Sequence, residues 1–363
     1  MKRKSIALVF LLIFSLIFLG ACADQDDDQH LDPEQPIQEE LIEEEIFEQL
    51  DRIETEYQNG RQEIQQNGDH SYQSVSPFTG MPVEDEYYNR AIAVSIENSP
   101  AARPQSGINE AEIIYEFMLE GGITRFLAIF WPEVPEKIGP IRSARPFIIE
   151  TAADYDALFL HAGASPDGFQ MLNDIELMHL DEIYQSQYFW RSSKRRAPNN
   201  LYTGKSSLGD YLNNLDEREY PDQFNFITAS VISNFSSAEE ITIDYWGGYN
   251  VLYRYNSLEN NYYRYINDFD TPHQVESGEH LTAKNIIVKY VDTYTKDEEG
   301  RQNINLNSNG DIKLFRDGTV INGNWERNSN NQLVYLDNND NEIEINPGQT
   351  WIQLVPNGTE INY

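Results

Sequence analysis

The sequence has 363 residues, and 60 acidic residues against 26 Lys and Arg give it a net charge of -34 at pH 7. This balance argues against nucleic-acid binding through bulk electrostatics, because contacts to phosphate need Lys and Arg in excess. Aromatic residues make up 12% of the chain, which is ample for globular cores. Cys22 is the single cysteine, which excludes an intramolecular disulfide and a cysteine metal site.

The N-terminus has the three zones of an export signal. Residues 2–4 are basic, residues 6–19 are almost entirely apolar, and two small residues precede Cys22. The apolar zone is about 14 residues long, whereas a membrane-spanning helix needs roughly 20. The pattern therefore favours a cleaved signal peptide over a permanent transmembrane anchor.

Residues 19–22, Leu-Gly-Ala-Cys, resemble the lipobox of bacterial lipoproteins. The resemblance implies that residues 1–21 are a signal peptide and that Cys22 carries a diacylglycerol and an N-acyl lipid. More than one acyl chain gives stable anchoring. We therefore expect a lipid-anchored protein on the extracytoplasmic face of the cell membrane, with no further cofactor. An ordinary signal peptide with a chance cysteine is the alternative.

The segment 22–76 is predicted to be an acidic tether, because its many acidic residues face only Arg52 and Arg61. Apolar residues at a spacing of three to four predict an amphipathic helix within it, at about 38–58. These apolar residues are Ile42, Ile46, Leu50, Ile53 and Tyr57. Such a helix packs on its own domain or frays in solvent, or it docks on a partner.

An α/β domain is predicted over residues 77–218, because strand-like and helix-like segments alternate there. The expected strands cover 91–96, 113–117, 124–131 and 157–161, and the expected helices cover 143–155, 169–172 and 206–214. Residues 219–363 carry short β-branched and aromatic runs between glycine turns, which predicts a mainly antiparallel β domain. These runs are 241–245, 250–255, 262–266, 286–290, 312–315, 332–336 and 351–355. The fold class is therefore α+β overall.

Four arginines stand beside Gly and Pro in the first domain, and a further basic cluster follows at 191–196. The four are Arg103, Arg125, Arg142 and Arg145. The guanidinium group offers a planar fork of donors that fits phosphate or carboxylate. The arginines converge on an anionic ligand, or each pairs with a nearby glutamate such as Glu116, Glu120 or Glu150.

Other residues with chemical potential give weaker patterns. His161 ends an apolar run, which favours a satisfied strand-end histidine over a catalytic base, and no zinc-ligand spacing surrounds it. Ser165 lacks the Gly-x-Ser-x-Gly elbow of serine hydrolases. The sequence therefore assigns no catalytic residue and no metal ligand.

Long motifs stand in both halves of the chain. They are 103–107, 120–126, 139–146 and 161–163 in the first half, and 285–288, 317–318, 323–325 and 348–352 in the second. They resemble the YerB-like bacterial lipoproteins, a two-domain family of unknown function, from about Pro77 to the end. At 198–200 the chain reads Pro-Asn-Asn where that family usually has Pro-His-Asn, so a catalytic histidine is not expected there.

The order of strands and arginine motifs also resembles, at the level of pattern, the LytR-CpsA-Psr phosphotransferases. That resemblance implies that Arg103, Arg125, Arg142 and Arg145 clamp a polyprenyl pyrophosphate, with Asp154 or Asp156 holding Mg²⁺.

We favour a non-enzymatic binding or regulatory protein of the cell envelope, because a clear anchor stands beside an incomplete catalytic set. Its partner would be an envelope protein or a wall precursor. The alternative is a phospho-ligand binding protein or phosphotransferase of cell-wall assembly. The alternative requires the four arginines to meet in one pocket with a carboxylate nearby.

Overall fold

The computed structural model describes residues 75–83, 90–216, 218–227, 235–245, 248–267 and 270–363. All of these residues lie in one compact unit. Cys22, the signal peptide 1–21 and the helix expected at 38–58 lie outside the described residues. Within the described part, none of the helices has the length and apolar character needed to cross a bilayer.

A large mixed sheet runs through the unit, with 12 strands among the described residues. In spatial order its main path is β18 (Leu333–Asp337), β17 (Thr319–Arg327), β16 (Gly310–Arg316), β14 (Asn285–Thr295), β20 (Thr350–Pro356), β2 (Ile113–Met118), β3 (Thr124–Phe130), β1 (Ile92–Glu97), β4 (Leu158–His161) and β5 (His179–Asp181). Off this path, β15 (Gln302–Asn305) pairs with β14, and β9 (Ser236–Ser237) pairs with β17.

Strand β20 joins the two halves of the chain within this sheet. It pairs in parallel with β14 on one side and with β2 on the other, so that Trp351 lies opposite both Ile286 and Ile114. The regions predicted as separate domains, 77–218 and 219–363, therefore contribute strands to one continuous sheet. The second region also contains a parallel pair, β14–β20, among its antiparallel ones.

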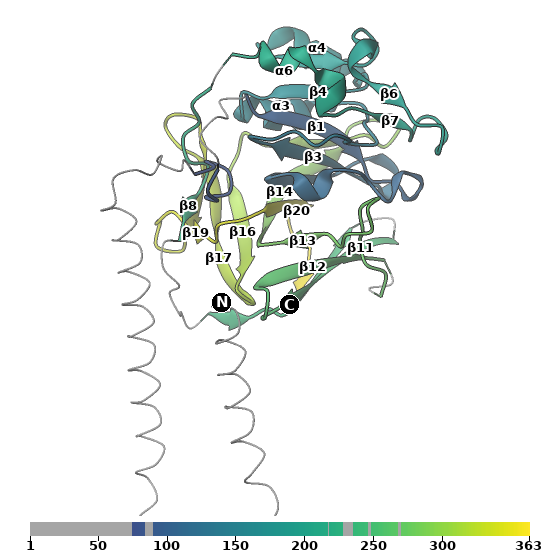
Figure 1. Cartoon of the computed structure of the whole chain (residues 1–363). Helices are drawn as coiled ribbons and strands as arrows, with labels where there is room; N and C mark the ends of the chain where they lie inside the picture. The colour runs from purple at the N-terminus through teal and green to yellow at the C-terminus, as the bar shows by residue number, and fades with distance from the viewer. Residues whose placement is uncertain (1–74, 84–89, 217, 228–234, 246–247, 268–269) are drawn as a thin grey trace, which may run out of the picture. The chain divides into compact units, whose positions relative to one another are not determined.

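A second sheet of five strands packs against one face of the first (Figure 1). Its order is β13 (Thr282–Ala283), β12 (Asn261–Ile266), β11 (Tyr249–Asn256), β10 (Glu240–Tyr245) and β21 (Ile361–Asn362). Side chains alternate across a strand, and β1 shows the result. Ile92, Val94 and Ile96 join the core between the two sheets, whereas Ala93 joins the core on the opposite face.

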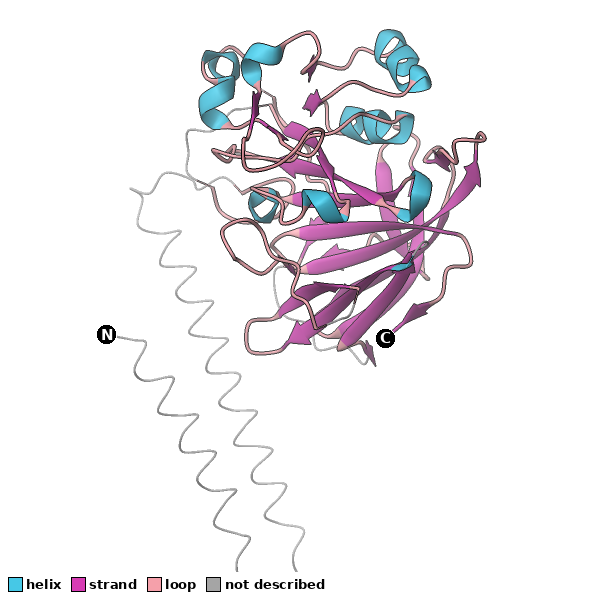
Figure 2. Ribbon diagram, turned by 90° about the vertical axis from the view of Figure 1, so that its right-hand side faces the viewer, coloured by secondary structure: helices cyan, strands magenta, loops and turns pink. Residues whose placement is uncertain are grey.

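The helices gather at the end of the unit that carries β4, away from the five-stranded sheet (Figures 1 and 2). Proline stands in the first turn of both α3 (Pro146–Asp154) and α4 (Pro166–Asp174), where its missing N–H costs nothing. The Ser165 side chain caps α4 by accepting from the Gly168 N–H at 3.2 Å. Phe147 and Ile148 of α3 are buried in the core on that face of the large sheet.

Short elements complete the unit. They are the pairs β6 (Trp190–Arg191) with β7 (Leu201–Tyr202) and β8 (Asn225–Phe226) with β19 (Glu344–Ile345), the helices α5 (Lys205–Leu208) and α6 (Asp210–Asn213), and the 3-10 turns η2 (Pro100–Ala102), η3 (Ile108–Glu110), η4 (Glu120–Gly122) and η5 (Ser186–Tyr188). The single helix expected at 206–214 is wrong. Gly209 adopts φ 46°, in the left-handed region, and divides it into α5 and α6.

Strand is the main element of the described residues, and helices are few and short. The strands expected from apolar runs in both halves are present, and their bounds differ by at most two residues except at β14, which continues five residues beyond the expected end at 290. Strand β17 is not predicted by the sequence, because Asn322-Gly323-Asn324 at its centre are typical turn residues and interrupt the apolar run. Its Val320 and Trp325 are nevertheless buried.

Candidate functional site: an arginine-bearing edge of the large sheet

Three parallel strands end at one edge of the large sheet. Strands β1, β4 and β5 pair in parallel, so their last residues, Glu97, His161 and Asp181, lie along the same edge. In open sheets, ligands bind in the crevice outside the carboxyl ends of such strands. This edge is therefore the candidate functional site.

The segment 138–145, which carries two of the four predicted arginines, crosses this edge. The Glu97 N–H donates to the Pro140 carbonyl and the Arg142 N–H donates to the Ser95 carbonyl, each at 2.9 Å. On its other side, the Ala162 N–H donates to the Arg142 carbonyl at 3.1 Å. The backbone thus holds Arg142 between the end of β1 and the loop after β4.

Glu97 is the anchor of the arginine cluster. Arg125 Nη2 donates to Glu97 Oε2 at 3.0 Å, and Arg142 Nε donates to the same oxygen at 2.5 Å. Burial raises the pKa of Glu97, but Arg125 and Arg142 more than offset this and leave the pKa below its usual value. Glu97 is fully buried and is therefore held as a carboxylate by two cations.

Arg145 joins the same cluster through Ser143. Arg145 Nη1 donates to Ser143 Oγ at 3.1 Å, and Arg125 Nη1 donates to the Ser143 carbonyl at 2.8 Å. Arg145 also forms an ion pair with Glu120. Burial, together with the charges of Arg145 and Arg142, lowers the pKa of Arg125 to about 10 against the attraction of Glu97. Three of the four predicted arginines therefore meet at this edge.

Arg103 lies beside this cluster but faces the second sheet. Its Nε donates to Asn98 Oδ1 at 3.0 Å and its Nη2 to the Asn98 carbonyl at 2.7 Å. Its guanidinium group stacks 4.9 Å from the centre of the Tyr249 ring, on β11. Burial lowers its pKa.

A buried ion pair that was not predicted lies behind Arg103 and links the two sheets. Arg264 Nη2 of β12 donates to Glu116 Oε2 of β2 at 2.7 Å, and both side chains are fully buried. Burial lowers the pKa of Arg264, but Glu116 and three tyrosines raise it above its usual value. The sequence suggests Glu116 as a partner for the four arginines, but it pairs with Arg264 instead. The sequence marks Arg264 only as an arginine among the tyrosines of 262–265.

A basic hairpin borders the edge. It carries four cations, Arg191 at the end of β6 and Lys194, Arg195 and Arg196 between β6 and β7. Arg191 pairs with Glu182, just beyond β5, at 3.0 Å, and Arg195 donates to the carbonyls of Ala102 and Pro104. The hairpin is thus fixed to the loops that follow β5 and β1. We call the hairpin together with Arg103, Arg125, Arg142 and Arg145 the basic edge.

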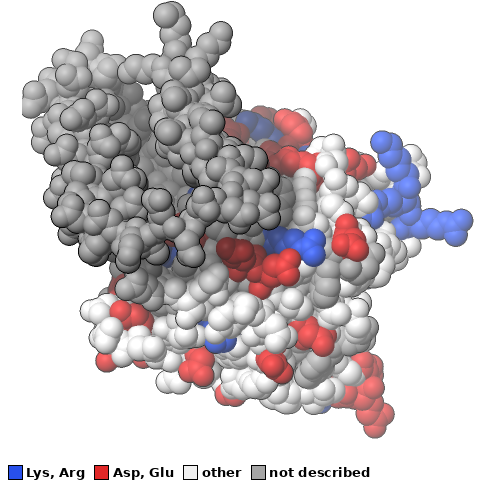
Figure 3. Space-filling view, turned by 90° about the horizontal axis from the view of Figure 1, so that it is seen from below, with Lys and Arg blue, Asp and Glu red and all other residues white. Residues whose placement is uncertain are grey.

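Cations outnumber carboxylates on the basic edge, since the glutamates that pair with its arginines are Glu97, Glu120 and Glu182. Figure 3 shows acidic side chains scattered over the face seen from below. Basic side chains extend at its right-hand margin, the side on which Figure 1 places β6 and β7. Such a local excess is notable in a chain of net charge -34.

Arg142 is the arginine of the cluster with donors to spare. Its side chain is 30% exposed, and its two terminal nitrogens make no hydrogen bond within the described residues. Ile183, 59% exposed, lies beside the same segment, because its side chain approaches Gly163 and the Gly163 carbonyl accepts from the Ala144 N–H. Tyr184, 75% exposed, follows it in the chain. An anion with an apolar part therefore finds both kinds of contact here.

The structure places the remaining candidate residues elsewhere. His161 is buried, with Nδ1 2.9 Å from the Gly163 carbonyl and Nε2 3.1 Å from His179 Nδ1, which confirms the interpretation as a satisfied strand-end histidine. Asp154 ends α3 and Arg145 precedes it, so the two are separated by the helix, about 13 Å long. Asp154 pairs with Arg327, and Asp156 pairs with Arg90 and Arg218. The suggestion that either carboxylate joins the four arginines is therefore wrong.

Fold and edge together define a strand-rich two-part protein with a basic edge. Family models match both parts, as the N-terminal domain (residues 78–218) and the C-terminal domain (residues 241–352) of the protein of unknown function DUF3048. The chain belongs to this family, which confirms the resemblance read from its motifs.

Two comparisons with Bacillus subtilis agree. The chain is 31% identical over 293 residues, 77% of this chain and 86% of the relative, to the protein of strain 168 that bears the name "Putative lipoprotein YerB". The crystal structure of YerB from Bacillus subtilis matches with a TM-score of 0.71 and 29% identity. That match covers 80% of this chain and all of the YerB chain.

Proposed function

We propose that this protein is a lipid-anchored lipoprotein of the extracytoplasmic face of the cell membrane that binds an anionic partner through its basic edge, without catalysing a reaction. The partner is an envelope protein or a wall precursor with an anionic docking group. The lipid on Cys22 holds the chain at the membrane, and the acidic tether 22–76 separates the folded unit from the lipid.

The observation that carries the proposal is the exposed cationic hairpin fixed beside the arginine segment. Lys194 and Arg196 make no ion pair within the described residues, and Arg142 keeps two free nitrogens. Charged groups on a binding surface steer a partner of opposite sign and set its register. The rest of this strongly acidic chain repels an anionic partner, so such a partner binds at the basic edge.

The anchor is supported by the lipobox and by the name of the Bacillus subtilis relative, "Putative lipoprotein YerB". Nothing in the basic edge resembles a complete catalytic set. Glu97 and Glu120 pair with arginines rather than with a nucleophile.

A phospho-ligand is the second candidate, and the convergence of Arg125, Arg142 and Arg145 favours it. A polyprenyl-pyrophosphate-like precursor would place its phosphates on Arg142 and its apolar chain near Ile183 and Tyr184. In a phosphotransferase the arginines would also have to stabilise charge in the transition state. Turnover of such a precursor, lost in Arg142→Gln, would replace the binding proposal with an enzyme.

Site-specific photo-crosslinking in intact cells tests the proposal. A photo-reactive residue at Tyr184 is expected to capture the same partner repeatedly, and Lys194→Glu with Arg196→Glu should remove that product. A matched probe at Leu258, 94% exposed on the β11–β12 turn, should not give it. Products at Tyr184 that persist unchanged after the charge reversal would contradict docking through the basic edge.

A further inference from the structure

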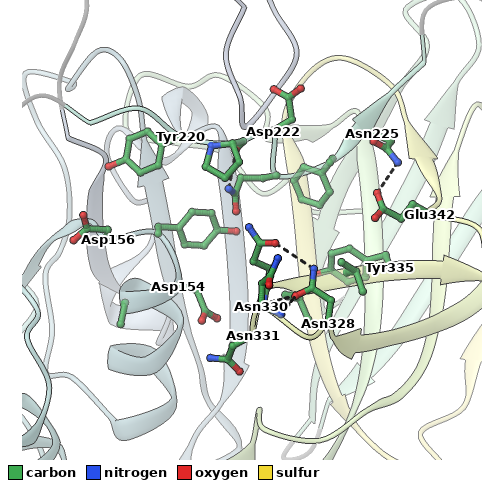
Figure 4. Close-up of a pocket in the computed structure, with 18 of the residues that line it drawn as sticks. Asp154, Asp156, Tyr220, Asp222, Asn225, Asn328, Asn330, Asn331, Tyr335 and Glu342 are labelled. Atoms are coloured by element: carbon green, nitrogen blue, oxygen red, sulfur yellow. Dashed lines mark hydrogen bonds between the residues drawn. The ribbon is translucent and has the colours of Figure 1, made fainter.

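A separate cavity of about 500 Å³ lies at the far end of α3 from Arg145. It is bounded by the carboxyl end of α3, the segment 218–225 and the turn between β17 and β18 (Figure 4). Its volume falls within the range of about 300–1,000 Å³ typical of small-molecule sites. The cavity belongs to a different surface from the basic edge and does not depend on the function proposed for that edge.

The base of the cavity is aromatic and polar at once. Tyr115 and Tyr155 join their hydroxyls at 2.7 Å, and both side chains are buried. The Tyr335 hydroxyl lies beside that of Tyr115, and Tyr335 is only 8% exposed. Three tyrosines therefore close the base of the cavity.

The polar groups around the cavity divide into two sets. Asp154 is engaged, because Arg327 donates to both of its oxygens at 2.9 Å, and Glu342 accepts from Asn225 at 2.7 Å. The side chains of Asn330, Asn331 and Asp222 make no hydrogen bond within the described residues. Figure 4 shows Asn330 and Asn331 together on one side of the cavity, with Tyr220 and Asp222 across from them.

We propose that this cavity binds a neutral glycan. Sugar hydroxyls both donate and accept, which matches free amides and a free carboxylate better than it matches any single charged group. The half-buried ring of Tyr220 offers a face for the C–H side of a sugar ring. The carboxylates that line the cavity repel phosphate and other anions, whereas the basic edge attracts them.

Titration calorimetry on the full chain tests the assignment, in a detergent without a sugar headgroup. The probes are chitotetraose, cellotetraose and maltotetraose, with inorganic pyrophosphate and spermidine for comparison. At least one of the three glycans is expected to bind with a Kd at or below about 1 mM. Pyrophosphate should not compete with it.

Variants locate the binding. Asp222→Ala removes an exposed side chain that makes no hydrogen bond within the described residues, so the fold should persist while glycan affinity falls about threefold to tenfold. Asn330→Ala with Asn331→Ala should lower affinity further. Asn339→Ala, equally exposed on the next turn and outside the cavity, should change nothing. Failure of all three glycans to bind, affinity unchanged in the cavity variants, or binding of spermidine alone would each overturn the assignment.

Discussion

Lys289 is a lysine in the middle of the large sheet, and its replacement gives the most quantitative prediction. It lies opposite Ile312 of β16 and Leu354 of β20 and is 3% exposed. Its Nζ stands 3.7 Å from the centre of the Trp325 ring and makes no hydrogen bond or ion pair within the described residues. Burial lowers the pKa of this amine from 10.5 to about 7, against the attraction of Asp154.

The shift in pKa converts directly into folding stability. The unfolded chain holds the proton up to its ordinary pKa of 10.5, whereas the folded chain releases it above about 7. The free-energy cost of burying the charged amine is therefore absent above pH 10.5, grows as the pH falls and reaches its full size below about pH 7. A difference of this size corresponds to about 5 kcal/mol. The contact with Trp325 returns about 1–2 kcal/mol to the charged form, which leaves about 3–4 kcal/mol.

Lys289→Met is therefore expected to stabilise the protein by about 3–4 kcal/mol near pH 6, and by about 1 kcal/mol or less near pH 10. Urea denaturation of the full chain and the variant at several pH values measures the difference, in which the other titrating groups cancel. Lys313→Met on neighbouring β16, a half-exposed lysine, is the control. A difference between Lys289→Met and the parent protein that stays constant from pH 6 to pH 10 would refute a buried amine with a lowered pKa.

Three further changes test other parts of the structure. Arg264→Met strands the Glu116 carboxylate between the sheets and should cost about 3–5 kcal/mol in chemical denaturation, whereas adding Glu116→Gln should restore part of the loss. Gly204→Ala places a methyl group 2.1 Å from the Glu136 carbonyl oxygen and should lower stability by about 1–3 kcal/mol in the same assay. Cys22→Ala should leave the precursor uncut or release the protein from the membrane fraction. An unchanged fractionation and size on gels would contradict the lipobox interpretation.

The strands were predictable where one short apolar run makes one buried strand. The run 91–96 gives β1 because every residue of that strand is buried. The order of the strands was not predictable, since Ile114 pairs with Trp351 and periodicity carries no information on pairing at that separation. Strand β20 could have stayed with β14 alone, and only the folded chain places β2 on its other side.

For the arginines, too, the residues were easier to predict from the sequence than the partners they contact. The guanidinium chemistry of Arg125, Arg142 and Arg145 could be predicted, because Gly and Pro mark the loops at strand ends. Glu97, the shared partner of Arg125 and Arg142, could not be predicted, because it ends an apolar strand and gives no signal as a charged group. The cavity was likewise hidden, since three distant segments supply its walls.

The continuous sheet makes one prediction about the two family regions. A fragment that ends at residue 218 would keep β2 but lose β20, which leaves the apolar strand Ile113–Met118 with an open edge. It would also lose the five-stranded sheet that covers Ile92, Val94 and Ile96. An exposed apolar edge strand pairs with other chains.

We therefore expect the fragment 77–218 to aggregate when produced alone. Adding residues 219–363 as a separate chain should restore soluble material, because β20 and the second sheet then cover both surfaces. Size-exclusion chromatography distinguishes the outcomes. A soluble monomeric fragment with cooperative thermal unfolding would show that the first region folds by itself, and that the shared sheet is a docking of two finished domains rather than one core.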